Sequence, residues 1–124
     1  MNNKKLGTAW EQEVCELMAQ RGFWVHFIVP DARGAQPFDV IAVKDDHALA
    51  IDCKTCVANS FDINRLEDNQ ISSFEKWIQC GNEMPMIAVK HKGRLYWIPY
   101  TLLKDKRSIK FSNLEYDPYY EEVL

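Results

Sequence analysis

The chain has 124 residues, of which 47% are hydrophobic and 27% are charged, and these fractions are typical of a globular protein. Its length favours one domain with an ordinary core, and no apolar run approaches the roughly 20 residues that cross a membrane. The first residues also lack the apolar stretch of a secretory signal. We therefore expect a cytoplasmic protein with no membrane partner.

The net charge of −3 argues weakly against a nucleic-acid-binding protein, because such proteins are usually basic. The acids are concentrated near the end, however. Residues 111–124 contain four acids and no Lys or Arg, so the preceding 110 residues hold 15 bases against 14 acids. We expect a single domain over residues 1–110 and an acidic tail over residues 111–124. The sequence leaves open whether this tail covers a basic groove, pairs with another subunit or is disordered.

The first half of the chain predicts one helix and three strands. The helix starts at Thr8, which can cap it with Glu11 at the third helical position, and it ends at Arg21-Gly22. The strands are "FWVHFIV", "FDVIAVK" and "HALAIDCKT", and the last two are joined at Asp45-Asp46 by a short hairpin turn. Residues 31–37, between the first two strands, form a loop.

The second half predicts another helix and a strand pair. A polar, poorly patterned stretch over residues 58–65 leads into an amphipathic helix over residues 66–80. The strands "MPMIAVKHK" and "RLYWIPY" follow, parted by Gly93, and a short helix is expected over residues 101–106. The order α-β-β-β-α-β-β indicates an α/β fold in which helices cover a central mixed sheet.

Two of these strands place acidic residues near one point. Asp39 lies in "PFDVIAV", and Asp52 lies thirteen residues later in "ALAIDCK", with Lys54 two positions further on. Because side chains alternate along a strand, Asp52 and Lys54 point to the same face. A strand-end aspartate satisfied by loop amides, and a simple salt bridge, would explain each feature singly. Together they break an apolar strand pattern, which is where a functional site is expected.

Glu11 is a third candidate acid. The residues three, four and seven positions after it are Val14, Cys15 and Met18, so Glu11 leans toward the apolar side of its helix. A carboxylate held against a core costs free energy unless it is paired or binds a metal. The alternative is that Glu11 only completes the capping box.

The chemistry that suits these residues is metal-dependent hydrolysis of a phosphodiester. Mg²⁺ prefers a few hard oxygen ligands and keeps bound waters. We expect Asp39 and Asp52 to bind the ion directly, helped by the main-chain carbonyl of Cys53, and Glu11 to bind it directly or through water. Lys54 would position and help deprotonate the attacking water, or stabilise the developing charge. Mn²⁺ is an expected substitute.

The cysteines offer a different chemistry. Cys53 and Cys56 form a lone Cys-Lys-Thr-Cys motif. A redox motif of this kind normally starts a helix, whereas this one closes a strand, and a zinc site would need two further ligands at motif spacing. Burial as small apolar side chains is the favoured interpretation.

These residues together resemble the PD-(D/E)xK, or restriction-endonuclease-like, nuclease superfamily, whose fold is an α-β-β-β-α-β core with a mixed sheet flanked by helices. The chain is similar in particular to archaeal-type and phage Holliday junction resolvases. The resemblance rests on Gly7-Thr8-Ala9-Trp10-Glu11, Arg21-Gly22-Phe23, Gly34, Pro37-Phe38-Asp39-Val40-Ile41-Ala42 and Ile51-Asp52-Cys53-Lys54. Asp52 stands where glutamate is more frequent. Gln70 is similar to a glutamine on the following helix of related nucleases.

The resemblance implies a DNA endonuclease with Glu11, Asp39, Asp52 and Lys54 as catalytic residues. It also implies a homodimer that cuts branched DNA in a prokaryotic or phage-infected cell. Basic side chains would contact phosphates. The candidates for DNA binding are Lys4, Lys5, Arg33, Arg65, Gln70, Lys90, Lys92 and Arg94.

Three alternatives stay open. The same fold could cut flaps, nicks or linear duplex instead of four-way junctions. It could also be a catalytically silent module that binds DNA or protein, although silent relatives usually lose at least one catalytic residue. A redox protein that uses Cys53 and Cys56 is the least favoured alternative.

Overall fold

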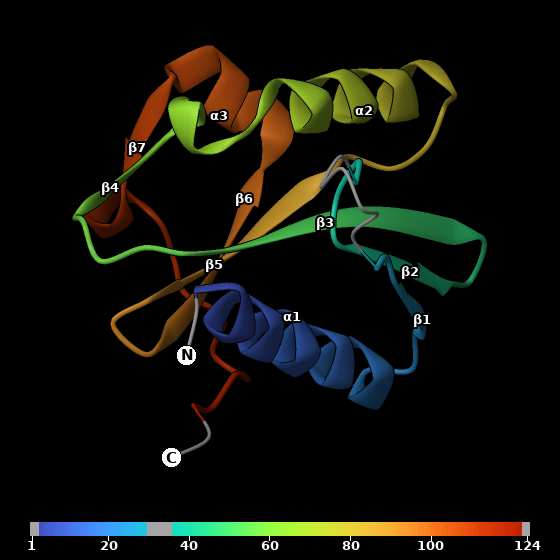
Figure 1. Ribbon diagram of the computed structural model, residues 1–124, viewed down its shortest axis with the longest axis horizontal. Coiled ribbons are helices and arrows are strands. Elements are labelled where there is room, and N and C mark those ends of the chain that lie inside the picture. The colour runs from blue at the N-terminus through green and yellow to red at the C-terminus, as the bar shows by residue number, and fades with distance from the viewer. Residues whose placement is uncertain (1–2, 30–35, 123–124) are drawn as a thin grey trace.

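A five-stranded mixed sheet runs through the centre of the protein (Figure 1). The computed structural model describes residues 3–29 and 36–122, with side chains from residue 9 onward in these ranges. The strands lie in the order β1-β2-β3-β5-β6, and only the central β3–β5 pair is parallel. Their bounds are β1 (Trp24–Phe27), β2 (Val40–Lys44), β3 (His47–Thr55), β5 (Met86–His91) and β6 (Arg94–Pro99).

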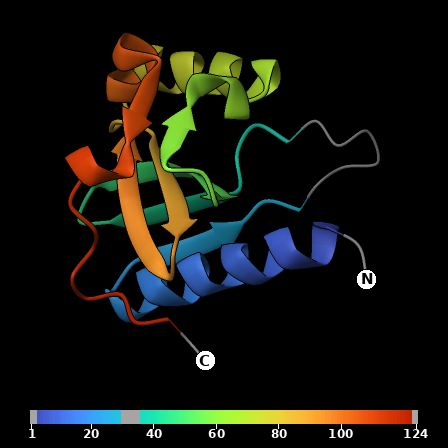
Figure 2. The ribbon, with the colours of Figure 1, turned by 90° about the vertical axis from the view of Figure 1, so that its left-hand side faces the viewer.

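Helices cover both faces of this sheet (Figure 2). Helix α1 (Asn3–Gln20) packs on one face, and α2 (Asp68–Gln79) and α3 (Tyr100–Lys106) pack on the other. Because strand side chains alternate, β3 contributes Ile51 to the core under α1 and Ala50 to the core on the α2 side. The α/β class and the predicted order of elements are confirmed.

The two hairpins of the sheet turn through left-handed backbone. Asp45 and Asp46 have φ values of 51° and 68°, and Lys92 and Gly93 have values of 50° and 73°. Positive φ at both central residues is the mark of the tight turn that suits the twist of a two-residue hairpin. The predicted turns at Asp45-Asp46 and at Gly93 are therefore confirmed.

Two local predictions are wrong. Helix α1 begins at Asn3, so Thr8 lies inside the helix and does not cap it, because the preceding Lys-Lys-Leu is itself a good helix former. The polar stretch over residues 58–65 is not irregular. It contains strand β4 (Ser60–Asp62) and the 3₁₀ turn η1 (Ile63–Arg65), and β4 pairs with β7 (Ser108–Lys110) in a separate two-stranded sheet.

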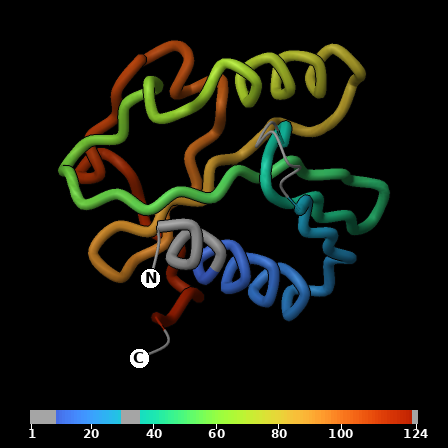
Figure 3. Tube along the Cα trace, in the orientation of Figure 1, coloured from blue at the N-terminus to red at the C-terminus, as the bar shows by residue number. Residues whose placement is uncertain are grey.

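The C-terminal segment runs back beside α1 (Figure 3). After the 3₁₀ turn η2 (Phe111–Asn113), the backbone N–H of Asp117 donates to the Leu95 carbonyl at 2.7 Å. Tyr120 packs edge-on against Trp10, with ring centroids 5.6 Å apart. This segment is therefore joined to the domain, and the boundary at residue 110 stays a prediction. Among the described residues, no helix is long and apolar enough to cross a membrane.

Candidate active site

Strand pairing brings two acids together at the start of β2. Val40 faces Ile51 in the antiparallel β2–β3 ladder, so the next positions, Asp39 and Asp52, lie opposite one another. The backbone N–H of Asp39 donates to the Ile51 carbonyl at 3.1 Å, which extends the pairing to this point. Both side chains are buried, and Asp52 has no exposed surface. The structure therefore joins the two acids that the sequence singled out.

Lys54 balances only part of this negative charge. Its Nζ lies 3.1 Å from Asp52 Oδ2, on the same face of β3 as predicted from strand alternation. Burial raises the pKa of Asp52 well above its ordinary value, the charge of Asp39 raises it further, and Lys54 acts in the opposite direction. Two carboxylates next to one ammonium form a site with a deficit of positive charge.

Asp39 is held from its own side. Its Oδ2 accepts the backbone N–H of Cys53 at 2.8 Å, and Gln36 Nε2 lies 3.4 Å from its Oδ1. The Gln36 carbonyl in turn accepts from Asn69 Nδ2 of α2 at 2.7 Å. Sequence reasoning missed Gln36 and Asn69, since single amides in polar segments give no pattern that could single them out.

Gln70 connects the start of α2 to the acids. It occupies the third position of this helix, and its Oε1 accepts the backbone N–H of the N-cap residue Glu67 at 3.0 Å. With the oxygen so occupied, its Nε2 donates to Asp52 Oδ1 at 2.7 Å. Lys54 Nζ lies 3.4 Å from the same Oε1. Gln70 is thus a neighbour of the acids and holds Asp52 in place.

Glu11 approaches the site from the other layer of the fold. It lies on α1, whereas the Asp52 side chain faces α2. Burial, together with the charge of Asp39 and against the opposing charge of Lys54, raises the pKa of Glu11 from 4.5 to about 7. The carboxyl group of Glu11 therefore interacts electrostatically with Asp39 and Lys54. Helix α1 begins at Asn3, so Thr8 is not its N-cap and Glu11 is not at its third position. The alternative that Glu11 only completes a capping box is therefore removed.

The donor chemistry of this site fits a hard divalent cation. Asp39, Asp52 and Glu11 offer carboxylate oxygens, and among the described residues the buried Asp52 Oδ2 accepts no hydrogen bond and has only the Lys54 ammonium, 3.1 Å away, as a polar neighbour. Among all residues that the structure describes, no three His, Cys, Asp or Glu side chains lie close enough to bind one ion together. An ion shared by Asp39 and Asp52 would therefore keep several waters, as Mg²⁺ usually does.

The Cys-Lys-Thr-Cys motif does not form a joint site. Cys53 belongs to the core under α1, and Cys56 to the core on the α2 side. Burial raises the pKa of the Cys53 thiol well above its ordinary value, and the nearby Asp39 and Asp52 raise it further. A thiol in these surroundings stays protonated and is a poor nucleophile.

The basic side chains proposed for DNA binding have different surroundings. Lys4, Lys5 and Arg33 lie outside the residues whose side chains are described. Arg65 donates to the Thr55 carbonyl at 2.9 Å and so lies at the end of β3. Lys92 and Arg94 lie at the turn between β5 and β6.

Lys90 is already paired with acids. Its Nζ lies 3.4 Å from Glu13 Oε2 and 3.3 Å from Glu122 Oε1, and it stands over the Trp10 ring at 5.5 Å. A phosphate would have to compete with both carboxylates for this ammonium.

The sheet order, the flanking helices and the acids at the start of β2 define the restriction-endonuclease-like fold, as the motifs predict. A sequence model described as "Archaeal holliday junction resolvase (hjc)" matches residues 2–115. The chain therefore belongs to the archaeal Holliday junction resolvase family.

The chain is also similar to one curated protein in sequence and to one solved structure in fold. The chain is 28% identical over 97 residues to the crossover junction endodeoxyribonuclease Hjc of Methanocaldococcus jannaschii, covering 78% of this chain and 68% of that protein. The crystal structure of Archaeoglobus fulgidus Hjc, a Holliday junction resolvase, superposes with a TM-score of 0.62 and 16% identity. It covers 77% of this chain and 74% of that one. At this identity the likeness shows the fold alone.

Proposed function

We propose that the protein is a Mg²⁺-dependent endonuclease that hydrolyses phosphodiester bonds in four-way DNA junctions. The observation that carries this proposal is the buried Asp39–Asp52 pair with Lys54 as its neighbouring cation, in a member of a junction-resolvase family. Carboxylates that repel one another in a buried place are costly in a purely structural role. They are suited to a site that takes up a divalent cation.

The residues divide the work of the reaction. Asp39 and Asp52, with the main-chain carbonyl of Cys53, would hold Mg²⁺, and Glu11 would reach it through water. When bound, the ion would lower the pKa of a water and neutralise charge on the phosphate. Gln70 keeps Asp52 oriented through its 2.7 Å hydrogen bond. Lys54, whose Nζ carries only donors, would orient the attacking water or stabilise the charge that develops on a phosphate oxygen.

The proposal includes a homodimer, because paired cuts across a symmetric junction require two copies of the site. Closed two-fold symmetry is the commonest arrangement that supplies them. DNA as the substrate would place the protein in the cytoplasm of a prokaryotic or phage-infected cell. Light scattering of the protein alone and with a junction would test the dimer, and a single copy on the cleaved junction would contradict it.

Cleavage of matched substrates tests the activity. A four-way junction, a flap and a linear duplex that share one labelled strand would be incubated with Mg²⁺, Mn²⁺ or EDTA. We expect paired symmetric cuts in the junction with either metal and none with EDTA. Equal cutting of all three substrates would leave a general nuclease of this fold. Binding with no cut in any metal would indicate the catalytically silent module.

A further inference from the structure

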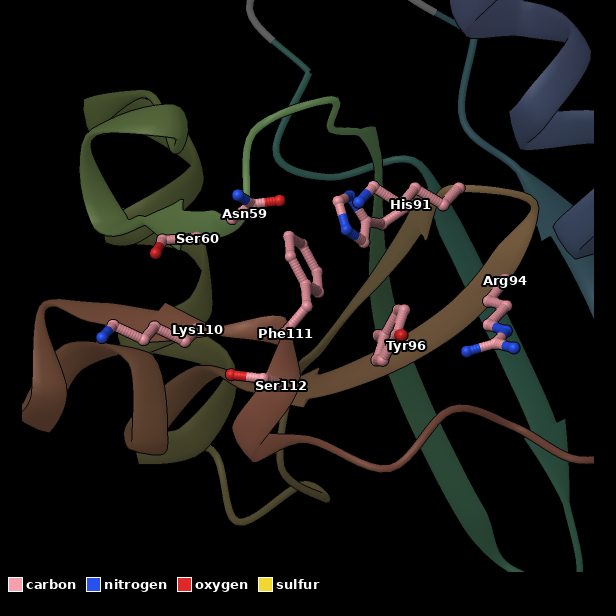
Figure 4. A pocket seen from close by; sticks show the side chains of 9 residues that line it. Asn59, Ser60, His91, Arg94, Tyr96, Lys110, Phe111 and Ser112 are labelled. Carbon is pink, nitrogen blue, oxygen red and sulfur yellow. The ribbon is translucent and has the colours of Figure 1, made fainter.

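A second site opens beside the hairpin that joins β5 to β6. It is a cavity of about 700 Å³, lined by the hairpin, by the residues that lead into β4 and by the segment around η2 (Figure 4). Pockets that hold groups the size of a small molecule have volumes of roughly 300–1,000 Å³. A lone phosphate would leave most of this space empty, so the volume suits a larger ligand.

The charge of the cavity indicates an anion. Lys92, Arg94 and Lys110 line it, and no acidic residue does. Among the described residues, none of these three forms a salt bridge. Lys90, on β5, differs in that it pairs with Glu13 and Glu122. The Arg94 guanidinium stands over the Tyr116 ring at 4.3 Å, which restrains it without neutralising it.

The basic groups are spread out rather than clustered. Figure 4 shows Arg94 and Lys110 at opposite ends of the cavity, with the rings of His91, Tyr96 and Phe111 between them. His91 stacks on Phe111 with centroids 4.0 Å apart and planes 8° apart, and Tyr96 tilts against Phe111 at 4.9 Å. These three rings are only 4–6% exposed and form a packed, apolar floor. Cations at both ends of such a floor suit a ligand with two negative charges and a flat or apolar middle.

Hydrogen-bonding groups complete the lining. His91 Nδ1 lies 2.9 Å from the Cys56 carbonyl, and because a carbonyl only accepts, this nitrogen carries the hydrogen. In the neutral ring, the other nitrogen, Nε2, is then an acceptor. Asn59 and Ser60 add side chains that both donate and accept. Such groups can bond the edge of a nucleobase.

The cavity lies at the end of the sheet where β3 leaves the acids. Thr55 is one residue beyond Lys54, and in the parallel ladder it pairs with Lys90, the residue before His91. Cys56 continues this contact through its backbone N–H, which donates to the Lys90 carbonyl at 2.9 Å. A DNA strand that passes Lys54 in the direction of β3 would therefore arrive at the cavity.

We propose that this cavity binds an unpaired nucleotide of a DNA strand, with the flanking phosphates on Arg94 and Lys110 and the sugar and base over the ring floor. A positive groove with aromatic side chains is the usual means of binding single-stranded DNA. The inference rests on the proposed function in that DNA is the substrate. It adds a place for a nucleotide that has left the stacked helix near the branch point.

The direct test measures binding of a short single strand. Fluorescein-labelled pentathymidine would be titrated into the Asp52→Asn protein and into the same protein with Arg94→Gln and Lys110→Gln, and the anisotropy followed over a range of salt. We expect binding to weaken about tenfold or more and the salt slope to fall by roughly 1.4, since each single-strand phosphate contact contributes about 0.7.

The matched control is Lys76→Gln with Lys106→Gln, which removes two exposed charges outside the cavity. Its binding should change little. Equal losses in the two double variants would show that only net charge matters and would overturn the inference. Thermal unfolding of both variants would verify that the fold is kept, which we expect because Arg94 and Lys110 are exposed.

A junction that carries 2-aminopurine at the branch point gives a second readout, because this base brightens when it leaves the stack. We expect brightening with the Asp52→Asn protein and its Lys76/Lys106 control, and loss of the signal in the Arg94/Lys110 variant. Brightening that is absent, or equal in all three, would contradict the inference even if the wild-type protein cuts junctions. Conversely, pentathymidine binding that depends on Arg94 and Lys110, without any junction cleavage, would sink only the proposed function.

Discussion

Asp52 and Asp117 each lie beside a basic side chain, yet their surroundings shift the pKa of the two carboxyl groups in opposite directions. Asp52 is within 3.1 Å of Lys54 but faces Asp39, and its pKa is raised. Asp117 is within 2.8 Å of Arg21 and also accepts from the Trp97 ring N–H at 2.9 Å and the Tyr119 backbone N–H at 2.9 Å. Burial acts to raise the pKa of Asp117, but these three partners lower it.

The difference separates an acid whose charge the fold stabilises from one that we propose to bind a metal ion. Asp117 has as many donors as its oxygens need, so its charge is stabilised by the fold and it clamps the C-terminal segment to the end of α1. Asp52 has too few donors for its position, so its charge destabilises the metal-free fold. A buried carboxylate with too few donors is a candidate binding site for a metal cation.

Asp52→Asn should separate activity from stability most strongly. We expect junction cleavage to fall by more than about 10²-fold, the scale of losing one group that stabilises a transition state. The unfolding temperature in EDTA at pH 8 should stay the same or rise, because one of two facing carboxylates is removed. Single-turnover cleavage and thermal unfolding would measure the two effects. Wild-type cleavage in this variant would refute the assignment of the site.

Asp117→Asn should have the reverse signature. The variant keeps an acceptor for Trp97 but loses the charge beside Arg21, so we expect about 1–2 kcal/mol less free energy of unfolding at pH 7. Since the folded state lowers this pKa, the difference should shrink as the pH falls below 3.8, the ordinary value. Urea unfolding at pH 7 and pH 3 would measure it. Asp105→Asn, on an exposed residue of α3, is the control, and an equal loss there would contradict the clamp.

Glu11→Gln should give the smallest change in stability and the opposite dependence on pH. The folded state raises this pKa from 4.5 to about 7, so the contribution of Glu11 to the stability of the metal-free protein should be greatest below pH 4.5 and should fall as the pH rises toward 7. The variant should flatten this decline without abolishing it, because Asp52 acts in the same direction. Unfolding temperatures in EDTA between pH 4 and pH 8 would show it. Superimposable curves for the two proteins would contradict the placement of Glu11.

Much of the site could be predicted from the sequence because its residues lie on or next to two paired strands. The alternation along "HALAIDCKT" places Asp52 and Lys54 on one face, and the hairpin at Asp45-Asp46 sets the register that brings Asp39 opposite. These are consequences of local geometry, in which a side-chain period of two and a two-residue turn leave few alternatives.

The remaining parts depend on contacts between distant segments. Gln36 and Asn69 are hydrogen-bonded although they are 33 positions apart in the sequence, and neither lies in a periodic pattern. Strand β4 has three residues and depends on pairing with β7, so its polar sequence does not reveal it. The start of α1 was misplaced because Thr8 is a good cap in isolation, while the residues before it favour the helix as well.

The segment that carries Asp117 and Tyr120 also bears on how the protein is made. The Tyr120 hydroxyl donates to Glu13 Oε1 at 2.9 Å, across 107 positions of the chain. During translation, helix α1 leaves the ribosome long before this partner exists, and contacts between such distant positions are slow to form. The helix that bears Glu11 is therefore clamped only after residues 117–122 have emerged, so the proposed metal site is incompletely braced in a nascent chain that lacks them.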